Sequence, residues 1–195
     1  MLDSKEKQNI LQNFKNKEDK IFVSNILDKA FRFERTNKIE YTNFLNMNEY
    51  NISKNILNSL KVKYYTYRFC EDSSRFVIFF IPDYITSFEE KYLKNYITIL
   101  KITPKNQDKI THRDYMGSIY SLGIKNDMIG DIFLQENFAY VNVIKPIDSY
   151  IINNLFKVKN QEVIISALDF SEIDISKIFA KFIEKEYIVP SMRCD

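Results

Sequence analysis

The sequence predicts an α+β protein: an N-terminal helical domain with a β-hairpin at residues 1–95, then a ferredoxin-like, RRM-like βαββαβ plait at residues 96–170. Three patterns predict this architecture. Apolar residues recur at helical spacing in the first 60 positions, two aromatic and β-branched runs follow, and strand and helix patterns then alternate from residue 97 to residue 168. A chain of 195 residues that is 45% hydrophobic can bury one ordinary core or two small ones, so two domains fit its length.

The N-terminal domain is predicted to begin with helices. Its apolar residues are separated by charged ones at intervals of three and four, which is typical of helices that pack one face on a core. These positions are Ile10, Leu11, Phe14, Ile21, Phe22, Ile26, Leu27, Ala30 and Phe31. A third helix is predicted from about Asn48 to Leu60. The aromatic runs at 64–69 and 76–81, separated by the polar residues 71–74, predict a strand, a turn and a strand that ends at Pro82.

The second half of the chain follows the order strand, helix, strand, strand, helix, strand after a predicted helix at about 86–95. The predicted elements are a strand at 97–102, a helix at 111–122 ended by Gly123, strands at 129–134 and 138–144, a helix at 147–156 and a strand at 163–168. This order is that of the split βαβ fold. RNA-binding modules, enzymes and small-molecule sensors all use that fold, so the fold alone does not decide the function.

Composition excludes several classes of protein. The chain has two cysteines, Cys70 and Cys194, and one histidine, which cannot supply a disulfide framework or a four-ligand metal site, so we expect no metal, no cofactor and a reducing cytoplasm. We expect no membrane partner, because no apolar run approaches the roughly 20 residues that span a bilayer and the N-terminus lacks a signal-peptide core. The net charge of +2 is small, but residues 96–160 hold eight bases against six acids, whereas residues 161–195 hold four against seven. A polyanion is therefore expected to meet residues before 160.

All three glycines, Gly117, Gly123 and Gly130, lie in one stretch with the only histidine, residues 111–131. Glycine permits a positive φ angle or the close approach of another backbone, so this stretch is expected to be the most constrained part of the chain.

The same stretch begins with a pattern that has two interpretations. Thr111 and Asp114 fit a capping box, a purely structural role at a helix start. His112 and Arg113 would then lie on the exposed first turn, where helix amides and the helix dipole favour a bound phosphate. The His-Arg-Asp letters do not indicate a protein kinase, since Ile119 stands where kinases have a magnesium-binding Asn and no Gly-rich loop is present.

Phe138 and Tyr140 lie on one face of the third strand of the plait, because side chains alternate along a strand. RRM proteins carry base-stacking aromatic residues on this strand. An aromatic core strand is the other interpretation, since Glu136 and Asn137 replace the basic residue and glycine that RRM proteins usually have there.

Residues 111–132 read Thr-His-Arg-Asp-Tyr-Met-Gly-Ser, then Leu-Gly-Ile-Lys, then Ile-Gly-Asp-Ile, and they are followed by Ala139-Tyr140-Val141 and Asn154-Leu155. This run resembles the YlmH family of bacterial and plastid RNA-binding proteins, and weaker likeness extends back through Phe44-Leu45 and residues 71–75. The resemblance implies an N-terminal domain, an RNA-binding α/β plait and a C-terminal ribosomal-protein-S4-like domain. Residues 191–195 resemble the start of that last domain, with Cys194 in place of an aliphatic residue, so residues 171–195 are expected to be a linker to an S4-like domain that this chain lacks.

The resemblance implies a non-catalytic RNA-binding protein that acts on ribosomal RNA or ribosome-bound tRNA, in translation or ribosome quality control, with a link to cell division. His112, Arg113, Lys125 and the surface at Gly117 are expected to contact the phosphate backbone, and Phe138 and Tyr140 to stack on bases. The alternative is a protein-interaction module that docks a partner through the sheet face and the N-terminal helices. A third class, an enzyme acting on a phosphorylated small molecule at the start of the 111–122 helix, lacks an assembled acid, base and nucleophile. The sequence does not predict the oligomeric state.

Overall fold

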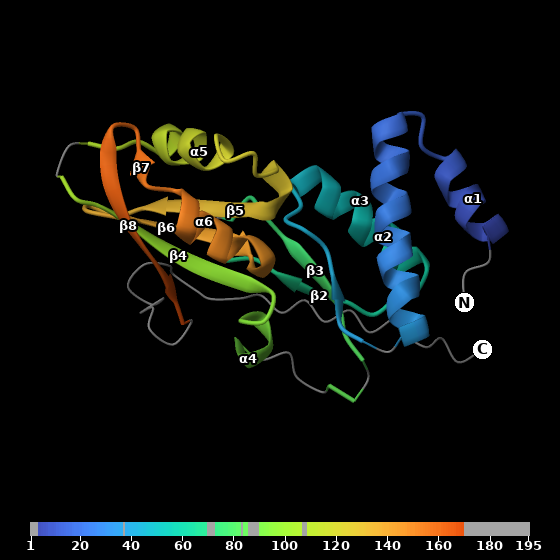
Figure 1. The fold of residues 1–195 in the computed structure, drawn as a ribbon. Helices are drawn as coiled ribbons and strands as arrows, with labels where there is room; N and C mark the ends of the chain where they lie inside the picture. The colour runs from blue at the N-terminus through green and yellow to red at the C-terminus, as the bar shows by residue number, and fades with distance from the viewer. Residues whose placement is uncertain are drawn as a thin grey trace. The chain divides into compact units, whose positions relative to one another are not determined.

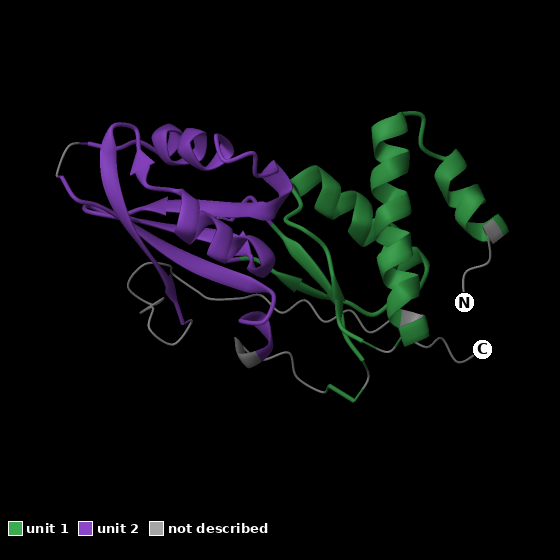
Figure 2. Ribbon diagram, viewed as in Figure 1, with its two compact units in different colours: residues 1–68, 76–87, 184–195 green, residues 69–75, 88–183 purple. Residues whose placement is uncertain are grey.

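A computed structural model describes residues 4–36, 38–69, 73–82, 84–85, 90–106 and 109–169. The chain forms two compact units, residues 1–68, 76–87 and 184–195 in one and residues 69–75 and 88–183 in the other (Figure 2). The domain boundaries that we predict from the sequence remain predictions. The predicted linker at 171–195, with Cys194, and the turn residues 70–72, with Cys70, lie outside the described residues.

Unit 1 combines three helices with a small antiparallel sheet (Figure 1). The helices are α1 (Ser4–Gln12), α2 (Lys17–Thr36) and α3 (Met47–Ser59), and the strands are β1 (Glu40–Tyr41), β2 (Tyr65–Tyr67) and β3 (Val77–Phe80), in the order β1-β3-β2. The predicted hairpin is confirmed, because Tyr65 pairs with Phe79 and Tyr67 with Val77. The apolar face of α2, with Ile26 and Ala30, is buried against the sheet residues Ile78 and Phe80, as the helical spacing of apolar residues predicts.

Unit 2 contains a five-stranded antiparallel sheet in the order β5-β6-β4-β8-β7. Its elements are α4 (Glu90–Leu93), β4 (Ile97–Pro104), α5 (His112–Tyr120), β5 (Ile129–Leu134), β6 (Ala139–Ile144), α6 (Asp148–Asn154), β7 (Lys157–Val158) and β8 (Gln161–Leu168), with single 3-10 turns at Asn126–Met128 and Lys145–Ile147. The first strand of the plait, β4, is central, and the third and fourth strands, β6 and β8, pair with its two edges. This strand order is that of the ferredoxin-like split βαβ fold, so the predicted α+β fold class is confirmed.

The core of the plait lies between the sheet and its two helices. Alternate residues of β4 and β6, including Leu100, Ile102 and Val141, face α5 and α6, and all three are completely buried. Tyr115 and Ile119 of α5 pack on this cluster because residues four apart share one helix face. Figure 1 shows α5 and α6 on the same side of the sheet, which leaves the opposite surface of α5 exposed.

Phe69 and Ser74, which belong to unit 2, contact the strand β5. The backbone amide and hydroxyl of Ser74 donate hydrogen bonds of 3.3 and 3.2 Å to the Asp131 carboxylate. Phe69 packs on Phe133 with ring centroids 5.0 Å apart. The pairing of β5 with β6 shifts register between Ile129 and Ile132, so Asp131 and its neighbour Gly130 lie in a β-bulge that aims the carboxylate at Ser74.

Two short strands, β1 and β7, are not among the predicted elements, and one predicted helix is described over fewer residues. The strands β1 and β7 have two residues each, too few to produce an alternating pattern. The helix predicted at 86–95 is described only at 90–93, and residues 86–89 lie outside the described residues. Among the described residues, none of the helices combines the length and the apolar character that crossing a membrane requires.

Candidate nucleic-acid interface

The capping box predicted at the start of α5 is present. The Thr111 hydroxyl accepts a hydrogen bond from the Asp114 amide, and the Asp114 carboxylate accepts bonds from the Thr111 amide at 2.8 Å and the Thr111 hydroxyl at 2.7 Å. These bonds, led by the one from the backbone amide, hold the pKa of Asp114 below its ordinary value. A carboxylate that is ionised at neutral pH therefore lies at the helix start, where an incoming phosphate would meet a like charge.

His112 and Arg113 are both exposed on the first turn of α5. Because the Asp114 carboxylate caps the helix, binding of a phosphate to the first helix amides is less favourable than the sequence analysis expects. We therefore expect the His112 and Arg113 side chains to contact phosphates on the outer surface of α5. Arg113 and Gly117 are four residues apart and therefore lie on the same face of the helix, and Gly117 is exposed.

The reason for Gly117 differs from the one that the sequence predicts. A Cβ atom built at Gly117 would have no neighbour within 4 Å, and the residue has no positive φ angle. Neither property for which the sequence analysis expects glycine, a positive φ angle or close approach of another backbone within the fold, applies to Gly117. Gly123 has φ +77°, a left-handed conformation that suits glycine, and it ends α5 as predicted. Gly117 consequently leaves a bare, open patch on α5 for which the fold itself has no need.

Basic residues that the sequence analysis did not single out lie beside α5. The turn between β7 and β8 brings the backbone amide of Lys159 within 3.4 Å of the Ser118 hydroxyl, and the Lys159 charge lowers the pKa of Asp114, to a lesser extent than the Thr111 hydrogen bonds. Lys159 has φ +57° and is exposed, as is Lys157. The count of bases in residues 96–160 includes both lysines, but only the contact of Lys159 with Ser118 shows that their turn lies next to α5.

Lys125 is exposed in the segment that follows Gly123. This segment is held by Asn126, whose side-chain oxygen accepts hydrogen bonds from Arg75, at 2.8 Å, and from the Tyr120 hydroxyl. Lys125 therefore lies on a hydrogen-bonded turn after the C-terminal end of α5, whereas Arg113 lies at the N-terminal end.

The aromatic pair of the third plait strand is present, but its two rings differ in exposure. Phe138 and Tyr140 contact each other edge to face with centroids 4.9 Å apart, and the Lys101 ammonium lies 4.4 Å from the centroid of Phe138. Tyr140 is buried, with 8% of its surface exposed, whereas Phe138 is half-buried. Tyr140 thus fits the aromatic core interpretation, Phe138 is the more open ring, and base stacking remains a prediction.

Three acids of the plait, Asp114, Asp131 and Asp148, accept hydrogen bonds within the fold, while Arg113, Lys125 and Lys159 are exposed. Besides Asp114, Asp148 is buried and accepts hydrogen bonds from the Thr98 hydroxyl at 2.8 Å and from Lys145 at 3.0 Å. Asp131 is held by Ser74 in the bulge. The surface around α5 is consequently more positive than the net charge of the chain indicates.

Among the described residues, no group of three His, Cys, Asp or Glu side chains could hold a metal ion. The geometry thus defines a class: a ferredoxin-like plait that presents basic side chains and a bare glycine along one exposed helix.

Comparison with known proteins agrees with this class. Residues 90–172 match the family described as "Putative RNA-binding domain in YlmH". The chain is also similar to a solved structure, the cell division protein ylmH from Streptococcus pneumoniae, with a TM-score of 0.63 and 19% identity over 82% of this chain and 96% of that one. No curated protein matches the chain at a significant level. The resemblance to the YlmH family is therefore confirmed: residues 90–172 match the family's putative RNA-binding domain, and the solved structure shares the fold over 82% of the chain.

Proposed function

We propose that this chain is a non-catalytic RNA-binding protein of the cytoplasm that acts on ribosomal RNA or ribosome-bound tRNA, in translation or ribosome quality control. The observation that carries the proposal is the match of residues 90–172 to a YlmH RNA-binding domain, on a plait whose exposed charges around α5 are basic. The name of the Streptococcus pneumoniae protein, which shares the fold, motivates the further proposal of a link to cell division.

The exposed surface of α5 supports contact with a phosphate backbone. Arg113 and His112 lie on the first turn of α5, Lys125 follows its C-terminal end, and Lys159 lies near Ser118 and Asp114, so basic side chains flank the helix on which Gly117 is exposed. A glycine inside an exposed helix costs about 1 kcal/mol relative to alanine. Because nothing in the fold approaches Gly117 within 4 Å, close approach of an RNA backbone is the reason that we assign to it.

The single histidine supports the non-catalytic part of the proposal. His112 is exposed on the first turn of α5, and within the described residues its imidazole has no hydrogen-bonded carboxylate, serine or cysteine. In nucleophile-and-base sites, a partner of this kind orients the imidazole and adjusts its pKa.

The experiment is a titration of the full chain against ribosomal subunits and free tRNA at two salt concentrations, with Arg113→Ala and a matched control, Lys94→Ala. Lys94 is an exposed base of the same unit, outside the α5 surface. Loss of one phosphate contact should weaken binding and reduce the slope of log K against log salt concentration by about 1. The melting temperature should hardly change, because exposed charges contribute about 0–1 kcal/mol to stability.

Two outcomes would contradict the proposal. Equal effects of Arg113→Ala and Lys94→Ala would remove the α5 surface as the site. Binding to ribosomes that does not respond to salt would favour the alternative, a module that docks a protein partner through the sheet face and the N-terminal helices.

A further inference from the structure

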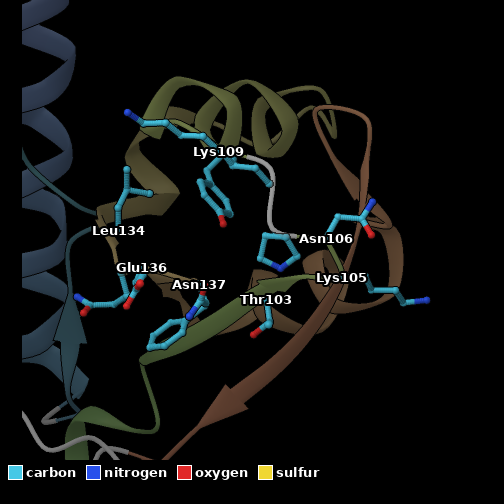
Figure 3. Close-up of a pocket in the computed structure, with 12 residues that line it drawn as sticks. Thr103, Lys105, Asn106, Lys109, Leu134, Glu136 and Asn137 are labelled. Carbon is cyan, nitrogen blue, oxygen red and sulfur yellow. The ribbon is translucent and has the colours of Figure 1, made fainter.

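A cavity of about 460 Å³ lies at the end of the plait's sheet, near the first turn of α5 (Figure 3). Its walls come from the end of β4, the segment that leads to α5, and the turn between β5 and β6. Its volume is within the range of about 300–1,000 Å³ that small-ligand sites occupy. Of the residues predicted to bind RNA, only Phe138 lines it.

The cavity is lined by groups that recognise a nucleobase. Three amide side chains, from Asn106, Gln135 and Asn137, line it, and none of them has a hydrogen-bond partner among the described residues. Each amide offers both a donor and an acceptor, the combination that reads the edges of bases. Phe138 adds an aromatic ring, and the Lys101 ammonium, 4.4 Å from its centroid, makes a cation–π contact with that ring.

The charges at the cavity are separated. Lys109 extends from the α5 side, and Glu136 lies on the turn between β5 and β6 (Figure 3). Lys105 is paired with Glu162 at 2.7 Å, whereas Lys109 has no ion-pair partner within the described part of the chain. A ligand with an anionic end and a hydrogen-bond-donating end therefore fits in one orientation.

We propose that this cavity binds one unpaired nucleotide, with its base against Phe138 and the amide of Asn137 and its phosphate at Lys109. The inference rests on the proposed function, since it makes single-stranded RNA the ligand that supplies the nucleotide. Lys109 lies just before the N-cap of α5, so an RNA strand leaving the cavity continues toward Arg113.

Glu136 gives the site a base preference. An ionised carboxylate only accepts hydrogen bonds, and it accepts them from the exocyclic amines of cytosine, adenine and guanine. Uracil has no such amine and presents a carbonyl oxygen instead. Nucleotides that carry cytosine, adenine or guanine are therefore bound more tightly than those that carry uracil.

The test is an NMR titration of the ¹⁵N-labelled full chain with CMP, AMP, GMP and UMP, followed by a single-stranded RNA and the duplex of the same sequence. CMP should shift the amide signals of residues 134–138 more than UMP does, and the single strand should compete with CMP while the duplex does not. Asn137→Ala, in an exposed turn, should weaken CMP binding about fivefold through loss of a hydrogen bond. Glu136→Ala should abolish the difference between CMP and UMP.

Arg113→Ala separates this inference from the proposed function, because Arg113 lies outside the cavity. It should weaken binding of the single strand and leave CMP binding unchanged. If Asn137→Ala changes neither CMP nor RNA binding while Arg113→Ala still weakens RNA binding, the cavity is not the nucleotide site and the proposed function stands. If CMP binds but no RNA competes with it, the cavity is a site for free nucleotides and this inference is overturned, while the effect of Arg113→Ala on RNA binding still decides the proposed function. If CMP does not bind and Arg113→Ala leaves RNA binding unchanged, both are overturned.

Discussion

Replacement of Gly117 by alanine should stabilise the protein. Gly117 lies inside α5 with a helical backbone, and a Cβ atom there would meet nothing within 4 Å. Alanine is about 1 kcal/mol more favourable than glycine in an exposed helix interior, and no steric cost offsets this gain. For a chain of 195 residues the melting temperature should rise by about 2–4 °C.

Gly123→Ala provides the matched control, since the same methyl group is added six residues further along. Gly123 has φ +77°, where a Cβ atom costs about 1–2 kcal/mol. The two substitutions should therefore change the free energy of unfolding, measured by urea denaturation, in opposite directions. A loss of stability in Gly117→Ala would refute the reasoning, because it would show that the open space at this position is occupied.

Gly117→Leu extends the prediction to binding. Leucine is almost as favourable as alanine in a helix, so the folded state should remain at least as stable as the native protein. Its side chain would fill the space that we assign to the RNA backbone between Arg113 and Lys159. Affinity for RNA should fall while the melting temperature does not. Unchanged affinity would mean that the bare patch on α5 is not a contact surface.

Two aspartates predict how stability depends on pH. Burial raises the pKa of Asp148, but hydrogen bonds from Thr98, Lys145 and Ser149 lower it by more, so the pKa in the folded state lies below its ordinary value. The ionised carboxylate therefore stabilises the fold above about pH 4, and this stabilisation is lost as the pH falls through the folded pKa. Asp148→Asn should lower the free energy of unfolding at pH 7 and flatten its decline below about pH 4, the ordinary range of an aspartate. Burial raises the pKa of Asp131 despite its serine hydrogen bonds, so the charged form is disfavoured in the folded state. Asp131→Asn should raise the free energy of unfolding at pH 7, with a gain that shrinks as the pH falls toward 4; a constant gain would rule out charge burial as its cause.

Local signals account for the parts of the fold that the sequence predicts correctly. Thr111 and Asp114 cap α5, Gly123 ends it, and the strand predicted at 138–144 matches β6 because its alternating residues Ala139, Val141 and Val143 face the helices. Caps, breakers and alternation each depend on a few neighbouring residues, so they can be read without tertiary information.

The features that the sequence does not predict depend on distant segments. The cavity joins Asn106 to Asn137, and no local pattern brings these two residues together. The open space at Gly117 cannot be predicted for a similar reason, because the sequence shows a missing side chain but not whether anything lies against it. Exposure likewise separates Phe138 from Tyr140, although both fit one strand face.

The number of acids in the plait does not show how strongly they oppose RNA binding. Asp114 caps a helix, Asp148 is buried between Thr98 and Lys145, and Asp131 holds residues 73–75 to the sheet. Substituting these acids alters stability, because each accepts hydrogen bonds within the fold. Exposed bases such as Arg113 can be substituted with little effect on folding. The two kinds of charge therefore respond to mutation in separable ways, and the small net charge of +2 conceals a surface on which binding can change while stability does not.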